Sequence, residues 1–133
     1  MQISGTGLNQ LSYRVIGAAY RVHSWLGPGL LESAYEEALA AELRDDELRY
    51  ARQQYLRVWY NGRRLGKVYR PDFIVERSLV VEIKAIRKIT GLELAQTLTY
   101  LKLSGCTLGL ILNFNVANMQ NGVRRVVLGY DDG

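Results

Sequence analysis

Apolar residues recur at helical spacing in the first third of the chain. Between residues 8 and 26 they fall at Leu11, Val15, Ala18, Ala19, Val22 and Leu26. Residues three or four apart share one face of a helix, so this spacing predicts an amphipathic helix over about 8–26. Gly27-Pro28-Gly29 interrupts the pattern. A second helix is predicted over about 30–43, with the apolar positions Leu31, Ala34, Tyr35, Ala38 and Leu39.

The middle of the chain carries strand patterns. Residues 50–60 are rich in aromatic and β-branched side chains and predict a strand. Asn61-Gly62 predicts a tight hairpin turn, although the following Arg63-Arg64 leaves room for a wider loop. The return strand is expected over 65–75. A second turn near Ser78 leads to a third strand over 79–86, which is apolar enough to lie at the centre of a sheet.

The last third alternates between helix and strand. A helix is predicted over 92–104, ended by Gly105, and is followed by a buried strand over 107–114 and a more peripheral strand over 123–128. The strand–helix–strand step from 79 to 114 predicts a right-handed crossover between parallel strands. We therefore expect one α/β domain over residues 1–133, with a mixed β-sheet flanked by helices.

Composition limits the function classes. With 133 residues and a hydrophobic fraction of 48%, the chain is long and apolar enough to bury a core. A lone cysteine, Cys106, gives no internal disulfide. We find no signal peptide and no apolar run of membrane-spanning length, so the cytoplasm is expected. The net charge of +4 is compatible with a polyanionic partner such as nucleic acid.

Charged residues interrupt the apolar strands of the middle segment. Asp72 follows Pro71 at the start of the return strand, and Glu82 and Lys84 share one face of the next strand. Such charges cost free energy unless they are paired or used. Two carboxylates, with the backbone carbonyl of Ile83 as a further ligand, suit a divalent cation such as Mg²⁺ or Mn²⁺. This arrangement favours phosphodiester hydrolysis, with Lys84 orienting water or neutralising charge on the phosphate.

A purely structural interpretation of these charges stays open. Asp72 could cap a turn, and Glu82 could pair with Lys84 at the rim of the sheet. Arg70, Arg87 and Lys88 flank the acidic motif and could contact a phosphate backbone. The other basic residues are scattered along the chain and most are expected to be solvated surface, among them Arg14, Arg21, Arg63, Arg64, Lys67 and Lys102.

Three further positions are candidates for the site. Glu32 lies beside the apolar stripe of the second helix, where it could reach a metal or simply favour the start of that helix. Gln96 and Tyr100 share a face of the third helix, opposite the apolar positions 94, 98 and 101. They could contact phosphate or steady Lys84, or form an ordinary solvated face. His23, the only histidine, cannot form a histidine-rich zinc site. It could hydrogen-bond a backbone carbonyl, which we expect, or approach the mouth of the site.

Together these residues resemble the PD-(D/E)XK nuclease superfamily. Pro71-Asp72 and Glu82-Ile83-Lys84 are similar to its defining motif, and the predicted element order from 30 to 114 is similar to its common core. Gln96 and Tyr100 resemble the Gln-xxx-Tyr element of the RecB-type exonucleases. Within the superfamily, Gly29-x-x-Glu32-x-x-Tyr35 resembles the signature of the small GxxExxY proteins.

The resemblance implies a restriction-endonuclease-like fold, with an α-β-β-β-α-β core, an extra N-terminal helix and a C-terminal strand. It implies Asp72 and Glu82 as metal ligands, Lys84 as the catalytic lysine, and supporting roles for Glu32, Gln96 and Tyr100. The implied activity is metal-dependent hydrolysis of nucleic acid, with DNA favoured over RNA. Members that keep the fold without the activity also exist, so a non-catalytic module that binds nucleic acid or protein is the alternative. Dimerisation through the last strand stays open.

Overall fold

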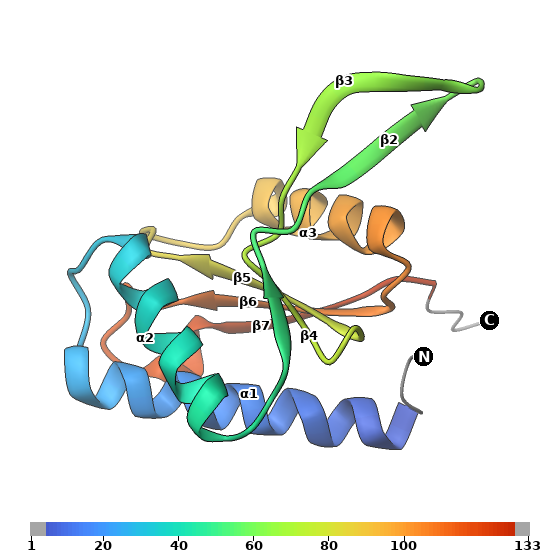
Figure 1. Cartoon of the computed structure of the whole chain (residues 1–133). Coiled ribbons are helices and arrows are strands. Elements are labelled where there is room, and N and C mark those ends of the chain that lie inside the picture. Colours follow the sequence, from blue (N-terminus) through green and yellow to red (C-terminus); the bar gives the residue numbers. More distant parts are fainter. Residues whose placement is uncertain (1–4, 130–133) are drawn as a thin grey trace.

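The computed structural model describes residues 5–129. Within these residues, three α-helices and seven strands follow one another (Figure 1), with a short 3₁₀ helix, Met119–Gly122, before the last strand. The helices are α1 (Gly5–Leu26), α2 (Glu32–Asp45) and α3 (Gly91–Ser104). The strands are β1 (Tyr50–Arg52), β2 (Leu56–Tyr60), β3 (Arg63–Tyr69), β4 (Phe73–Val75), β5 (Leu79–Lys84), β6 (Leu108–Asn113) and β7 (Val123–Val127).

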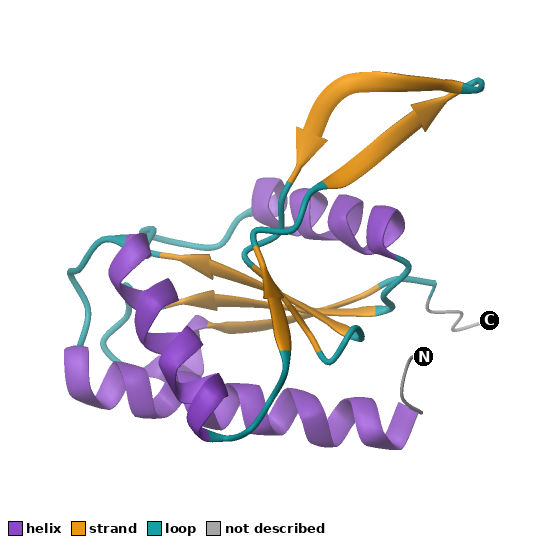
Figure 2. Cartoon of the chain, in the orientation of Figure 1, coloured by secondary structure: helices purple, strands orange, loops and turns teal. Residues whose placement is uncertain are grey.

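Five strands form a mixed sheet in the order β1-β4-β5-β6-β7. The β5–β6 pair is parallel, as the crossover pattern predicted, and the other pairs are antiparallel. Helices α1 and α2 cover one face of the sheet and α3 covers the other (Figure 2). The predicted α/β architecture is therefore confirmed. In the described part of the chain, no helix is both long and apolar enough to cross a membrane.

Alternation along β5 decides which layer each of its side chains enters. Leu79, Val81 and Ile83 join the core beneath α1 and α2, whereas Val80 packs on the α3 side. Successive side chains of a strand point to opposite faces, so Glu82 and Lys84 share the α3 side with Val80. Both charged residues of the motif therefore lie between the sheet and α3.

The ends of the helices follow local chemistry. Thr90 and Glu93 form a capping box at the start of α3, and Gly105 ends it in the left-handed conformation with φ 80°. The prediction that Leu31 belongs to the apolar stripe of the second helix is wrong. Helix α2 begins at Glu32, so Leu31 occupies the N-cap position without a side-chain capping bond, lies outside the buried stripe and is 78% exposed.

Two predicted long strands are each broken in the structure. The expected 50–60 strand stops at Gln53, which has a φ of 58°, and the expected 65–75 strand stops before Asp72. The outer halves, β2 and β3, pair only with each other and project from the body as a separate hairpin (Figure 1). Asn61 and Gly62 both have positive φ and join opposed residues, so the turn is the tight two-residue type.

Candidate active site

Asp72, which directly precedes β4, and Glu82, on β5, lie side by side. The antiparallel register of β4 and β5 pairs Phe73 with Val81, so the residues one step further along, Asp72 and Glu82, are neighbours. Oε1 of Glu82 accepts a hydrogen bond from the amide of Asp72 at 2.7 Å. In return, Oδ2 of Asp72 accepts one from the amide of Ile83, also at 2.7 Å. Each carboxylate thus fixes the backbone next to the other.

Burial makes this acid pair electrostatically unusual. Glu82 is only 3% exposed. Its burial, reinforced by the charge of Asp72, raises the pKa of Glu82 to about 8. Burial, together with the nearby Glu36 carboxylate, raises the pKa of Asp72 to about 6. The apo site therefore holds a proton at neutral pH, because two charged carboxylates are disfavoured there.

Two residues that hold Asp72, Gln53 and Glu36, were not predicted from the sequence. The side-chain amide of Gln53 donates to Oδ1 of Asp72 at 3.1 Å and to Oε1 of Glu36 at 2.9 Å. Glu36 is fixed in turn by Arg52, whose Nε lies 2.7 Å from Oε2. Glu36 lies one helical turn after Glu32 and therefore on the same face of α2, and this spacing could have predicted that it lies near the site. No sequence pattern predicted the role of Gln53, because it lies in a segment whose composition predicts a continuous strand.

Lys84 points toward α3. Its Nζ donates to Oε1 of Gln96 at 3.2 Å, and Nε2 of Gln96 donates to the hydroxyl of Tyr100 at 3.3 Å. Among residues 5–129, no ion pair joins Lys84 to Asp72 or Glu82 within 4.0 Å, so the simple salt bridge is not formed. The ammonium is still near enough to lower the pKa of Glu82, against the larger effect of burial.

Tyr100 lies in the core, so the alternative in which Gln96 and Tyr100 form an ordinary solvated face is wrong for Tyr100. Its side chain is only 6% exposed, because α3 packs on the sheet through Thr97, Tyr100 and Leu101. Burial and the charges of Glu82 and Asp72 raise the pKa of Tyr100 to about 12. The phenol therefore stays protonated and faces the acid pair from the helix side.

Glu32 reaches the end of β5 from the other layer. Its Oε2 accepts a hydrogen bond from the amide of Ala85, the residue after Lys84, at 3.2 Å. Within the described part of the chain, no three acidic, histidine or cysteine side chains come together as a metal-binding group. Tyr35 closes the loop before Glu32: its hydroxyl donates to the carbonyl of Gly27 and accepts from the amide of Leu30.

His23 and Cys106 have structural positions. His23 Nε2 lies 2.7 Å from the carbonyl oxygen of Val116, which confirms the expected backbone hydrogen bond. Cys106 is buried, and burial raises the pKa of its thiol.

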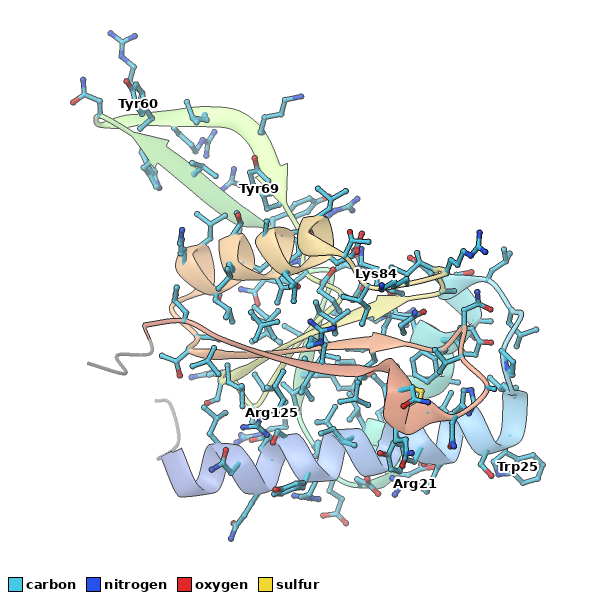
Figure 3. The ribbon with its side chains drawn as sticks, turned by 180° about the vertical axis from the view of Figure 1, so that it is seen from behind. Arg21, Trp25, Tyr60, Tyr69, Lys84 and Arg125 are labelled. Atoms are coloured by element: carbon cyan, nitrogen blue, oxygen red, sulfur yellow. The ribbon has the colours of Figure 1, made fainter. Side chains whose placement is uncertain are left out.

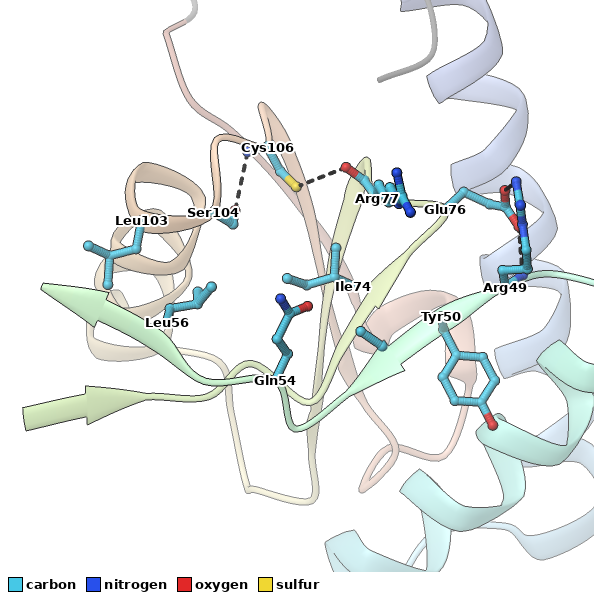
Figure 4. Close-up of a pocket in the computed structure, with 11 residues that line it drawn as sticks. Arg49, Tyr50, Gln54, Leu56, Ile74, Glu76, Arg77, Leu103, Ser104 and Cys106 are labelled. Atoms are coloured by element: carbon cyan, nitrogen blue, oxygen red, sulfur yellow. Dashed lines mark hydrogen bonds and ion pairs between the residues drawn. The ribbon is translucent and has the colours of Figure 1, made fainter. Parts of the chain in front are cut away.

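A cavity of about 720 Å³ lies beside Cys106, Tyr50 and Ile74 (Figure 4), and none of the predicted site residues lines it.

Comparison with known proteins identifies a family for the chain. A sequence profile described as the PD-(D/E)XK nuclease superfamily matches residues 9–126, which include every residue of the acid pair and of the Lys84–Gln96–Tyr100 chain. No curated protein and no solved structure gives a significant match. The matched span covers most of the chain, so this protein belongs to the PD-(D/E)XK nuclease superfamily.

Proposed function

We propose that this protein is a divalent-metal-dependent nuclease that hydrolyses phosphodiester bonds of nucleic acid. The observation that supports this most is the buried pair Asp72–Glu82, interlocked by two hydrogen bonds, with Lys84 on the same face of the sheet. Membership of the nuclease superfamily supports the same chemistry. Perturbed pKa values in a cluster of this kind are typical of functional sites.

The donor set suits a hard divalent cation. Mg²⁺ and Mn²⁺ prefer oxygen ligands and often use one or two carboxylates, with water and substrate phosphate supplying the rest. In the described part of the chain, Oε2 of Glu82 receives no hydrogen bond, so it is available as a ligand. We assign Asp72 and Glu82 as the principal ligands, with the Ile83 carbonyl as a further one. Glu32 does not join this pair in one cluster within the described residues, so we assign it a contact with the cation through a bridging water. When bound, the cation would neutralise charge that develops on the phosphate.

The remaining residues position the reacting groups. Gln96 holds the Lys84 ammonium through its amide oxygen and is itself held by the buried Tyr100 hydroxyl. Lys84 can then orient the attacking water or donate a hydrogen bond to a phosphate oxygen. On the other side, Gln53 and Glu36 fix the Asp72 carboxylate. Lys84 is the catalytic lysine in this proposal, and Gln96, Gln53 and Glu36 are positioning residues.

We further assign the chain to the GxxExxY group of the superfamily, as a single nuclease-like domain. Gly29 has a φ of 104°, which a residue with a side chain rarely adopts. Tyr35 closes the same loop through its hydroxyl, and Glu32 touches the end of β5. The three signature residues thus support the position of α2 against the strand that carries Glu82 and Lys84.

Cleavage of labelled single- and double-stranded DNA and RNA tests the proposal. We expect cutting with Mg²⁺ or Mn²⁺, none with EDTA, and a rate at least about 100-fold lower for Lys84→Ala and Asp72→Asn. Lys102→Ala removes the same charge from an exposed lysine of α3 and should leave the rate unchanged. Undiminished cutting by Lys84→Ala would contradict the mechanism, and no cutting on any substrate would favour the non-catalytic binding module.

A further inference from the structure

The β2–β3 hairpin concentrates the positive charge of the protein. Residues 55–70 contain five of its seventeen basic residues and none of its thirteen acidic ones, namely Arg57, Arg63, Arg64, Lys67 and Arg70. The segment 55–70, which is the hairpin with one flanking residue on each side, thus carries a charge of +5 against the net +4 of the whole chain, and the rest of the protein is slightly acidic. Three of the basic residues that were expected to be scattered surface, Arg63, Arg64 and Lys67, lie on β3, and this hairpin projects from the body of the protein (Figure 1).

Exposed aromatic rings on β2 lie opposite basic residues on β3. Trp59 is 65% exposed and Tyr60 is 67% exposed. The strand register places Trp59 opposite Arg64 and Tyr60 opposite Arg63. Successive residues of a strand point to opposite faces, so each face of the hairpin near its tip presents an aromatic ring beside an arginine.

The hairpin lacks the packing that normally stabilises a ribbon. Every residue of β3 is exposed, and in β2 only Leu56 is buried, where it joins the core between α3 and the sheet. A two-stranded ribbon without a covering layer is marginally stable in water. Leu65 and Val68 also expose apolar surface. This combination is typical of a surface that is covered by a partner.

The hairpin is rooted in the candidate active site. The chain leaves the main sheet after Gln53 and returns at Asp72, and the Gln53 amide donates to the Asp72 carbonyl at 3.1 Å. The two side chains are hydrogen-bonded as well. A partner held along the hairpin is therefore brought directly to the acid pair.

We propose that the β2–β3 hairpin is a duplex-DNA-binding arm that enters the major groove. The major groove of B-DNA admits a two-stranded β-ribbon. Arginines on both faces would meet the two phosphate backbones that flank the groove, whereas a single strand could cover only one face. The major groove of an RNA duplex is deep and narrow and excludes side chains. Binding of a DNA duplex by the hairpin does not depend on the proposed nuclease function. Only the cleavage of that bound duplex by the acid pair rests on it.

Binding measured in EDTA tests the arm apart from catalysis. We expect fluorescence anisotropy to show tighter binding of a labelled DNA duplex than of single-stranded DNA or duplex RNA of the same sequence. Arg63→Gln/Arg64→Gln should weaken duplex binding at least about tenfold and reduce the slope of log affinity against log salt by about 2. Arg77→Gln/Arg124→Gln, which removes two exposed arginines outside the hairpin, controls for net charge and should have little effect.

The two tryptophans give an independent readout of where DNA binds. Trp25 lies on α1, on the opposite side of the molecule from the hairpin (Figure 3), and is 88% exposed. In Trp25→Phe protein, duplex DNA should quench the fluorescence of Trp59. In Trp59→Phe protein, the remaining Trp25 should not respond.

Several results would overturn the inference. These are equal loss of affinity in the two double variants, quenching of Trp25 instead of Trp59, or equally tight binding of single strands. Absence of DNA binding with a dimer that requires Trp59, seen by sedimentation, would assign the hairpin to a second copy of the chain. Because EDTA prevents cleavage, hairpin-dependent binding without any cutting in Mg²⁺ would contradict the nuclease proposal and leave the arm intact.

Discussion

At the scale of residues, the acid pair shows which parts of the candidate site could be predicted from the sequence. Asp72, Glu82 and Lys84 were predictable because charges in an apolar strand are costly unless they have a use. Their interlocking is set by the β4–β5 register, which makes residues 72 and 82 direct neighbours. Glu36 and Gln53 were not predictable in the same way, since their contact with Asp72 depends on the left-handed backbone of Gln53.

Stability of the metal-free protein should fall as pH rises through the neutral range. The pKa of Glu82 is about 8 in the folded state, against 4.5 ordinarily, so the folded protein keeps a proton that the unfolded chain releases between these values. That stabilisation is complete below about pH 4.5 and is lost as pH approaches the folded pKa. With EDTA present, we expect Tm to drop by ~5 °C or more between pH 5 and pH 8.5.

Glu82→Gln tests the origin of this pH dependence. The amide cannot ionise but keeps an oxygen that accepts from the Asp72 amide, so the drop in Tm should be smaller. The part that comes from Asp72, whose pKa is raised to about 6, should remain and fall at the acid end of the window. Glu76 and Glu93 have lowered pKa values, and their stabilisation is lost only in acid, outside this window. A wild-type Tm that rises with pH, or an equal drop in the Gln variant, would show that Glu82 is not buried as described.

At the scale of elements, helices were more predictable than strands. The 3.6-residue period and the glycines at 27, 29 and 105 place all three helices within a few residues of their bounds. The strand patterns of 50–60 and 65–75 gave no sign that each would divide between two sheets. Strand propensity reports how a residue fits a half-buried pleated surface, and it does not say which sheet the residue joins.

The loop between α1 and α2 should depend on the hydroxyl of Tyr35. Tyr35→Phe keeps the ring that stacks on Phe114 but leaves the Gly27 carbonyl and the Leu30 amide without this partner. We expect a loss of about 1–3 kcal/mol of unfolding free energy, measured with urea. Tyr13→Phe alters a hydroxyl on a side chain that is 70% exposed and should change stability by less than about 0.5 kcal/mol. Equal values for the two variants would show that the loop is held by other contacts.

The whole molecule combines a covered sheet with an uncovered arm. Helices on both faces bury the strands that carry the acid pair, and the hairpin extends outside these layers (Figure 2). The mixed sheet, its parallel β5–β6 step and its edge strand β7 follow from the order of predicted elements. The separate hairpin does not, because its independence arises from the breaks at Gln53 and before Asp72.

Truncation of the hairpin should separate DNA binding from folding. Leu56 and Tyr69 are direct cross-strand partners, so replacing residues 57–68 by Asn-Gly would close the ribbon at its base with the native type of turn. We expect native circular dichroism and a Tm within about 5 °C of wild type, since the removed residues are largely exposed. Duplex affinity should fall at least as far as in Arg63→Gln/Arg64→Gln. Full affinity in the truncated protein would exclude the hairpin as the binding arm.

Metal binding by the acid pair is the most direct test of the proposed activity. Isothermal titration of the protein with Mn²⁺ at pH 7, in buffers of different ionisation enthalpy, measures both the bound ion and the protons released. We expect saturable binding with release of about one proton, because Glu82 is protonated in the metal-free site and must lose that proton to become a ligand. Glu82→Gln should abolish the proton release and weaken binding severely. Absence of saturable Mn²⁺ binding, or unchanged binding and proton release in Glu82→Gln, would contradict the assignment of Asp72 and Glu82 as a metal site.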